Sequence, residues 1–241
     1  TAYPIPAIFE PQLPISKVLP GDFQRLLATS DDTLWLITDQ GVAHLSEENW
    51  QVYLSELNGK FVGLDADRNV WIVNEDTSKI SVWNGNSWVD YGSDSGWSPI
   101  KNEDQYYWST GLIKNDDKGG VWLATSHDVR YFDGERWQIF TPTDMGVREK
   151  SPATPWPVFT VMISQKTGNV WVGECDWSGP GPFGGLGIYW YDGEIWRGAN
   201  SPVDSGCVIA MEEDDQGQIW MGVDGTLWRY TPDSYTWTDY L

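Results

Sequence analysis

The chain has 241 residues, and its 35 acidic and 15 basic side chains give a formal charge of −20 at pH 7, which repels phosphate backbones and anionic lipid surfaces. We therefore expect no nucleic-acid partner, and no apolar run reaches the roughly 20 residues that a membrane-spanning helix needs. The length suits a single all-β domain with a sizeable core, and the acidic residues are interpreted as a solubilising surface.

Residues 1–22 contain five prolines. Proline lacks the backbone donor that a helix interior requires, so this segment predicts an extended, proline-rich lead-in to the domain. No signal peptide is visible at Thr1. An opening of this kind is compatible with the stalk of a mature secreted chain or of an anchored lipoprotein, so we expect the lead-in to act as a tether.

From residue 23 onward, one pattern recurs five times. Each copy has a polar turn, an apolar residue and a tryptophan, followed by a short strand, a second turn and another strand. Repeats of roughly 40 to 50 residues rich in short strands are typical of β-propeller blades. The anchoring tryptophans, spaced by 36, 51, 49 and 49 residues, are Trp35, Trp71, Trp122, Trp171 and Trp220.

Each copy predicts four antiparallel strands, the outermost of which carries a second tryptophan. The third and fourth strands are joined by Asn-Gly or Asp-Gly in WNGNSW, YFDGERW and WYDGEIW, as tight hairpins require. The fold class predicted is all-β, a β-propeller of five four-stranded antiparallel blades in one domain, 23–241. A longer parent protein with more blades is the alternative. The expected blades are 23–59, 60–108, 109–157, 158–206 and 207–241.

The second strands are apolar at nearly every position, as in VWLA at 121–124. Continuous apolar runs suit a sheet that is buried on both faces, as a blade is between its neighbours. We therefore expect the repeated tryptophans to be core residues, each contributing several kcal/mol at roughly 25 cal/mol per Å² of buried apolar surface. The second series comprises Trp50, Trp88, Trp137, Trp196 and Trp237.

The third and fifth copies, DDKGGVWLAT from Asp116 and DDQGQIWMGVDGTLWRY from Asp214, resemble the two-component regulator propeller repeat. Its pattern runs D-x-x-G-x-[IV]-W-[IV]-G-T, followed by a turn and a Trp-x-x-Tyr strand, and the resemblance extends over residues 23–241. It implies a secreted or periplasmic bacterial sensing module, since the propeller of that family is usually the extracytoplasmic sensing part of a regulator. A weaker, architectural likeness to tachylectin-type five-bladed lectins implies amino-sugar binding.

Four tryptophans fall outside the repeated strand positions, in irregular stretches. Strand direction places the second-to-third turns and the blade-to-blade connections on one side of the propeller, here called the loop-rich rim, together with an insertion at 178–185. Aromatic rings stack on apolar sugar faces while carboxylates accept hydroxyl protons, so this rim is the predicted ligand site. The alternative is that the long loops bury their own tryptophans as small satellite cores. The candidates are Trp97, Glu103, Tyr106, Tyr107, Trp108, Trp156, Glu174, Asp176 and Trp177.

The two cysteines, Cys175 and Cys207, are expected on the same rim in adjacent blades. A disulfide there would indicate an oxidising compartment, and two buried free thiols are the alternative. Neither His44 nor His127 has a metal-ligand spacing, and the Asp-rich turns lack the ligand run of a calcium loop. We expect no metal and no cofactor.

Enzyme classes find little support, because the chain has only two histidines and no recognisable nucleophile elbow. A carboxylate-dependent glycoside hydrolase is the catalytic alternative, with Glu103, Asp104, Glu174 and Asp176 as the available acids. The sequence predicts a non-catalytic extracytoplasmic binding or sensing module that recognises a small ligand, such as a saccharide, on the loop-rich rim. A protein–protein interaction scaffold is the alternative function.

Overall fold

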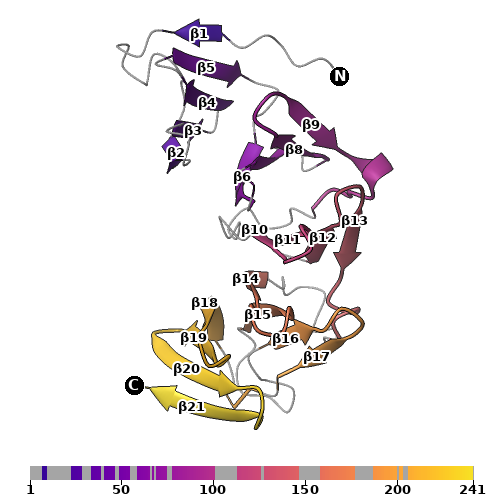
Figure 1. Cartoon of the computed structure of the whole chain (residues 1–241), viewed down its shortest axis with the longest axis vertical. Helices are drawn as coiled ribbons and strands as arrows, with labels where there is room; N and C mark the ends of the chain where they lie inside the picture. Colours follow the sequence, from indigo (N-terminus) through magenta and orange to yellow (C-terminus); the bar gives the residue numbers. More distant parts are fainter. Residues whose placement is uncertain are drawn as a thin grey trace. The chain divides into compact units, whose positions relative to one another are not determined.

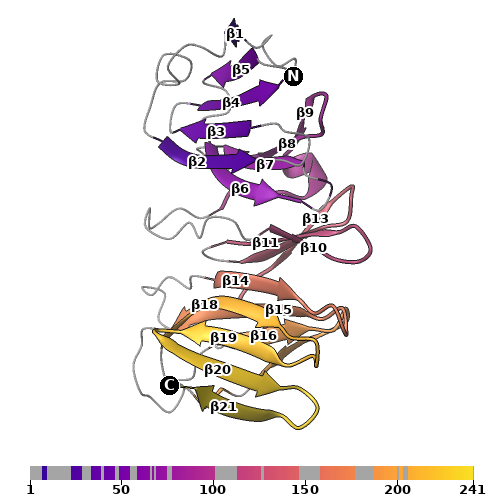
Figure 2. The ribbon, with the colours of Figure 1, turned by 60° about the vertical axis from the view of Figure 1, so that its left-hand side comes forward.

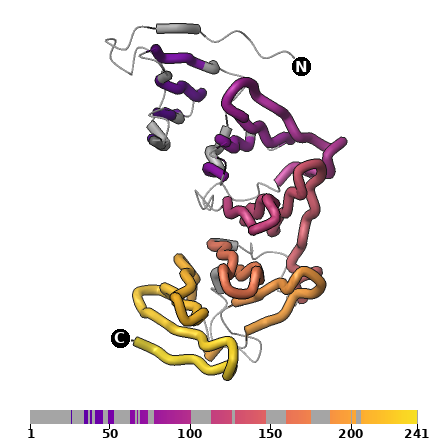
Figure 3. Tube along the Cα trace, in the orientation of Figure 1, coloured from indigo at the N-terminus to yellow at the C-terminus, as the bar shows by residue number. Residues whose placement is uncertain are grey.

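The computed structural model divides the chain into two compact units, Thr1–Pro99 and Ile100–Leu241, and each is described by itself. Figure 3 follows the chain through both units. The structure describes residues 7–9, 23–28, 34–38, 41–46, 49–54, 59–65, 67, 69–74, 78–100, 113–125, 128–146, 158–176, 187–199, 201–202 and 206–240.

The first unit contains the first two blades, each an antiparallel meander of four strands (Figure 1). A short 3-10 turn, η1 (Ser93–Ser95), follows the second blade. The first blade consists of β2 (Phe23–Ala28), β3 (Leu34–Thr38), β4 (Gly41–Ser46) and β5 (Asn49–Leu54). The second consists of β6 (Gly59–Leu64), β7 (Val70–Asn74), β8 (Ile80–Trp83) and β9 (Trp88–Tyr91).

The proline-rich lead-in contributes a strand of its own. β1 (Ala7–Phe9) pairs antiparallel with β5, with Ala7 opposite Val52 and Phe9 opposite Trp50. The first sheet therefore has five strands, because the outer strand of a blade is an edge with backbone groups that an extended segment can pair. Residues 7–9 of the expected lead-in thus belong to the sheet of the first blade.

The second unit contains the other three blades. The third consists of β10 (Ile113–Asn115), β11 (Val121–Ala124), β12 (Val129–Phe132) and β13 (Trp137–Phe140). The fourth consists of β14 (Val158–Ile163), β15 (Val170–Asp176), β16 (Ile188–Tyr191) and β17 (Trp196–Gly198). The fifth consists of β18 (Gly206–Glu213), β19 (Ile219–Val223), β20 (Thr226–Thr231) and β21 (Thr236–Tyr240). The predicted all-β fold of five four-stranded antiparallel blades is confirmed.

Blades four and five are also joined edge to edge. β15 runs on past its partners in blade four and pairs antiparallel with the start of β18, with Cys175 opposite Cys207 and Asp176 opposite Gly206. Figure 2 shows β14, β15 and β18 side by side. The two blades therefore form one continuous hydrogen-bonded sheet at this end.

A repeated aspartate explains why the turn and the anchoring tryptophan are separated by the same number of residues in several copies of the motif. The carboxylate of Asp214 accepts hydrogen bonds from the backbone N–H groups of Gln216 and Gln218, both at 2.9 Å, and from the indole N–H of Trp220 at 2.8 Å. One side chain thus closes the turn between the first two strands and orients the tryptophan six residues later. The same pairing joins Asp65 to Trp71 and Asp116 to Trp122.

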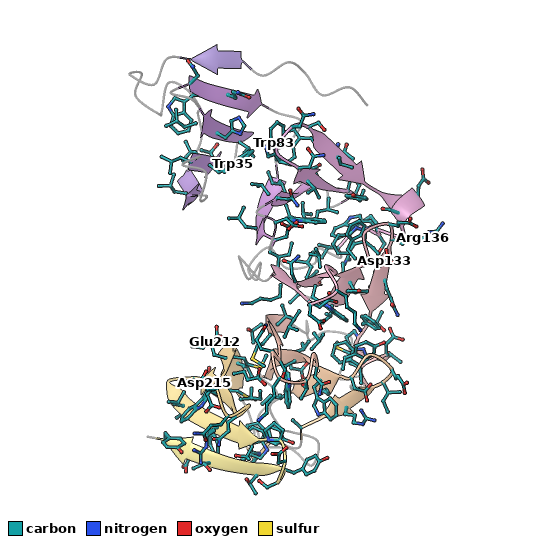
Figure 4. All side chains as sticks on the ribbon, in the orientation of Figure 1. Trp35, Trp83, Asp133, Arg136, Glu212 and Asp215 are labelled. Atoms are coloured by element: carbon teal, nitrogen blue, oxygen red, sulfur yellow. The ribbon has the colours of Figure 1, made fainter. Side chains whose placement is uncertain are left out.

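Trp35, Trp71, Trp122 and Trp171 are buried, as predicted for the core between blades. The packing joins consecutive blades within each unit: one cluster combines blades one and two, another blades three and four, and a third blades four and five. Figure 4 shows Trp35 beside Trp83, with ring centroids 5.9 Å apart. The His44 ring lies 4.5 Å from that of Trp35, so this histidine is part of an aromatic cluster.

Candidate functional site

Most of the residues predicted for the loop-rich rim lie outside the described part of the chain and stay predictions. Asp176 is the last residue of β15, and its backbone alone is described. The histidine at 127 also falls outside the described residues. The six candidates in this group are Glu103, Tyr106, Tyr107, Trp108, Trp156 and Trp177.

Trp97 is described, and its side chain is 2% exposed. Its backbone N–H donates to the carbonyl of Gly92 at 3.1 Å, and Gly96 before it adopts φ 85°. This tight turn folds the connection back on itself and directs the indole inward. The expectation of an exposed ring at Trp97 is therefore corrected, and the residue fits the alternative of a loop that buries its own tryptophan.

Glu174 is also buried, with 4% of its surface exposed near the end of β15. Its side chain lies over Gly187, where a Cβ atom would collide with the carboxylate, and the Tyr189 hydroxyl approaches the carboxylate oxygen at 3.5 Å. Glu174 therefore lies at the base of the fourth-copy insertion, and no carboxylate is presented to solvent at this position.

The cysteines lie at the same end of the sheet. Cys207 is buried and disulfide-bonded, and Cys175, its register partner across β15 and β18, is the only other cysteine of the chain. The bond links the strand that leads into the insertion to the first strand of the next blade. It thus restrains the loop-rich end of blades four and five.

A cavity of about 540 Å³ lies between the outer halves of blades four and five. This volume is within the range of small-ligand pockets. Two residues that line the cavity, Asp192 and Tyr235, lie in turns at the end of the blades opposite the cysteines. The cavity is therefore not part of the loop-rich rim that the sequence predicted as the ligand site. In the fourth copy alone, the outer strand lacks an aromatic residue three positions after its tryptophan. This missing aromatic residue is the feature of the sequence that could have indicated the cavity. The lining residues are Trp190, Asp192, Arg197, Gly198, Ala199, Tyr230 and Tyr235.

One wall of the cavity carries a fixed pair of opposite charges on an aromatic ring. The guanidinium of Arg197 lies 4.9 Å from the ring centroid of Trp190 and donates to the carboxylate of Asp192. Asp192 also accepts the backbone N–H groups of Ile195 at 2.8 Å and Glu194 at 2.9 Å. The N–H of Ile195, the side chain of Arg197 and the N–H of Glu194 hold the pKa of Asp192 far below its ordinary value. The carboxylate is therefore ionised and oriented at neutral pH.

The opposite wall is formed by two tyrosines at different depths. Tyr230 in β20 is 2% exposed, and burial raises the pKa of its phenol, which therefore stays protonated at neutral pH. Tyr235 in the β20–β21 turn is 74% exposed and has φ 54°, a left-handed conformation that side-chain-bearing residues seldom adopt. The cavity therefore has a buried floor, which includes Ala199, and an exposed aromatic residue at its mouth.

The described lining of the cavity supplies groups that can bind a small ligand. Its described lining supplies aromatic faces, phenols, one guanidinium and one carboxylate. Among the residues that the structure describes, no three of His, Cys, Asp and Glu are grouped so as to hold a metal ion. The arrangement can stack against a ring and hydrogen-bond its hydroxyl groups.

No protein-family model and no curated protein matches the chain. Solved structures that resemble it include the GH74 xyloglucanase of Xanthomonas campestris, at 14% identity and TM-score 0.58, with 92% of this chain and 38% of that chain covered. The extracellular domain of a B. thetaiotaomicron protein described as a hybrid two-component system is similar at 18% identity and TM-score 0.53, with 92% and 29% covered. YCF48, solved with the D1 peptide, is similar at 17% identity and TM-score 0.54, with 92% and 67% covered.

These likenesses concern the fold, and the chain spans only 38% and 29% of the first two structures. Extracellular domains of two-component system proteins are among the similar structures, and at this identity the likeness extends to the propeller fold. The set also includes enzymes, so the propeller class leaves catalysis open. Within the described residues, the structure contains no helix with the length and apolar character to cross a membrane.

Proposed function

We propose that this chain is a non-catalytic, extracytoplasmic propeller module that binds or senses a saccharide in the cavity between blades four and five. The observation that carries the proposal is the cavity itself, in which two tyrosines face a guanidinium–carboxylate pair that lies on the ring of Trp190. The exposed ring of Tyr235 matches the apolar face of a sugar ring, and the charged side chains on the opposite wall form strong hydrogen bonds with hydroxyl groups. A small number of placed polar groups among aromatic rings is typical of a small-ligand site.

The state of Asp192 supports a binding role over a catalytic one. Glycoside hydrolysis by the usual route needs two carboxyl groups, one of which has a raised pKa so that it can act as a general acid. Asp192 supplies the one carboxylate of the described lining, and its pKa is lowered. This carboxylate therefore fits a hydrogen-bond acceptor for hydroxyl groups better than a proton donor.

The proposed location outside the cytoplasm is supported by two features. The Cys207 disulfide suits an oxidising compartment. The motif resemblance and the extracellular two-component domains among the similar structures agree with this placement. The proline-rich lead-in, which pairs with the first blade at residues 7–9, would then tether the module.

The first experiment is a thermal-shift and tryptophan-fluorescence screen of the whole chain against a broad oligosaccharide panel. We expect a saturable response to at least one saccharide, and about tenfold weaker binding for Tyr235→Ala and for Arg197→Gln, equivalent to about 1.4 kcal/mol. Because Tyr235 is exposed, its truncation should leave the fold intact. The control is Leu227→Ala, which removes another exposed side chain from blade five without touching the cavity.

The same screen decides between the alternatives. No response across the panel would overturn the saccharide proposal. A response that both cavity variants retain would move the site to the loop-rich rim, where Trp156→Ala and Trp177→Ala are then the test. Release of shorter sugars during incubation would establish a glycoside hydrolase. Because Asp192 is ionised well below pH 5, binding at pH 5 should equal binding at pH 7.

A protein-interaction scaffold is the second candidate function, and exposed apolar side chains on blade five favour it. Leu227 is 42% and Ile209 is 64% exposed, whereas Ile188, at the position of Leu227 in blade four, is buried. Replacing Leu227 with Lys should reduce capture of a protein partner and leave saccharide binding unchanged. Loss of saccharide binding in that variant would argue against two separate surfaces.

A further inference from the structure

The outer strands of the blades share an aromatic residue that blade four lacks. Three positions after the second tryptophan, the other four copies carry Tyr53, Tyr91, Phe140 and Tyr240, and the fourth carries Ala199. The strand register agrees: Phe140 pairs with Val129, the first residue of β12, and Ala199 donates its N–H to Ile188, the first residue of β16, at 2.9 Å. Ala199 therefore occupies the position of an aromatic ring.

In the blades where this ring is described, it packs on the tryptophan of the second strand. The centroids of Phe140 and Trp122 are 5.8 Å apart with nearly parallel planes. Tyr91 stacks on Trp71 at 6.2 Å, and Tyr240 lies 5.0 Å from Trp220. A ring on that tryptophan is thus the ordinary filling of this part of a blade, and the methyl group of Ala199 does not provide it.

The neighbouring rings show what surrounds the position. Between blades three and four, the Phe140 ring also lies 5.2 Å from Tyr191 and 5.4 Å from Trp196. The register equivalents in blade five are Tyr230 and Trp237. Tyr230 lines the cavity, and the indole N–H of Trp237 donates to the carbonyl of Ala199 at 3.2 Å. Blade five therefore keeps the two aromatic residues that would surround the ring, Tyr230 and Trp237. Blade four lacks the ring itself, because Ala199 is at the position of Phe140.

We infer that Ala199 makes the cavity a slot for one ring of the ligand, and that the slot receives the terminal ring of a glycan chain. This inference rests on the proposed function. The floor at Ala199 and Tyr230 is buried, while Asp192, Arg197 and Tyr235 at the mouth are exposed. Because the floor is buried and the mouth is exposed, we expect a ring to enter from the mouth. The end of a chain then fits the slot better than an internal residue, which continues in both directions. The charged pair then hydrogen-bonds the hydroxyl groups of the inserted ring.

The decisive variant is Ala199→Phe, which restores the side chain found in blade three. Saccharide binding should weaken at least about tenfold. The melting temperature should stay the same or rise, because the cavity is filled in the way that Phe140 fills its site. The control is Ala210→Phe, which adds the same side chain at an exposed position of β18, away from the cavity. Ala199→Leu, a smaller addition, serves as a second variant if Ala199→Phe does not fold.

The wild-type chain supplies a test that needs no mutation. Linear maltohexaose and the cyclic hexamer α-cyclodextrin have the same linkage and ring number, and the cyclic form has no chain end. If a maltooligosaccharide responds in the panel, we expect binding of the linear form alone. For any other responding glycan, blocking the non-reducing and the reducing end in turn gives the same test, and one of the two blocked forms should fail to bind.

The outcomes separate this inference from the proposed function. If no saccharide binds the wild-type chain, the proposed function is wrong and this inference falls with it. If a saccharide binds, and Ala199→Phe or glycans without a free end bind equally well, the cavity function stands and the terminal-ring slot is overturned. Weakened binding by a folded Ala199→Phe, together with a requirement for a chain end, supports the slot.

Discussion

Asp65 illustrates how single side chains hold the blades in this chain. Its carboxylate is 8% exposed and accepts the backbone N–H of Asn69 at 2.9 Å and the indole N–H of Trp71 at 2.8 Å. Removing it leaves the buried indole N–H of Trp71 and the partly buried N–H of Asn69 without this acceptor, and each such loss costs about 1–3 kcal/mol. Asp65→Ala should therefore lower the free energy of unfolding by about 2–3 kcal/mol, measured by denaturant titration.

Asp67 provides the matched control in the same turn. Its side chain is exposed, so Asp67→Ala should change stability by less than about 0.5 kcal/mol. If both variants lost the same free energy of unfolding, the loss would come from the change of charge. The hydrogen bond between Asp65 and Trp71 would then not be what stabilises the turn.

Individual side chains also show where sequence reasoning reached its limit. The spacing from Asp214 to Trp220 marks the turn and the second strand, because the hydrogen bonds that hold the motif are local in sequence. The inward orientation of Trp97 depends on the turn formed by η1 and Gly96, and no periodicity reports it. The cavity exists because Ala199 stands where the other outer strands carry an aromatic ring. The sequence indicates this only after the five outer strands are aligned by register.

At the scale of elements, the strands were predictable because each blade is a local meander with its own turn residues. The β1–β5 pairing was not, since a three-residue strand has no pattern and its partner is an edge more than 40 positions away. The pairing of β15 with β18 was also missed, although Cys175 and Cys207 were expected at one rim. This pairing between blades depends on how many residues β15 has beyond its partners in blade four. The last residues of β15 are in a strand because they pair with β18, and the local sequence does not indicate this.

The disulfide at the β15–β18 junction gives a prediction for these two elements. Closing a loop of about 30 residues in the unfolded chain is worth about 3–4 kcal/mol in the chain-entropy model. Cys207→Ala should therefore unfold at a clearly lower guanidinium concentration than the wild-type chain under oxidising conditions. Dithiothreitol should lower the stability of the wild-type chain to that of the variant and leave the variant unchanged. Insensitivity of the wild-type chain to the reductant would contradict a stabilising bond.

For the whole chain, net charge outweighs individual ion pairs. The formal charge is −20, and the ion pairs among the described residues include Lys79–Asp90, Arg130–Asp128 and Arg197–Asp192, each of which lies within one blade. Repulsion among like charges destabilises a compact state, and salt screens exposed charges with a Debye length of about 10 Å at 0.1 M. Raising KCl from 20 to 500 mM should therefore stabilise the protein. A gain of about 1 kcal/mol corresponds to a melting temperature about 2–4 °C higher.

A variant with fewer exposed acids tests the cause of this salt effect. Glu212 and Asp215, labelled in Figure 4, and Asp239 are exposed acids of blade five. Changing them to Gln, Asn and Asn should raise the melting temperature at low salt and reduce its dependence on KCl, because part of the repulsion is already removed. If the melting temperature of the wild-type chain instead fell with added salt, local ion pairs would be the dominant electrostatic contribution. The repulsion would then be too weak to limit the stability of this acidic chain.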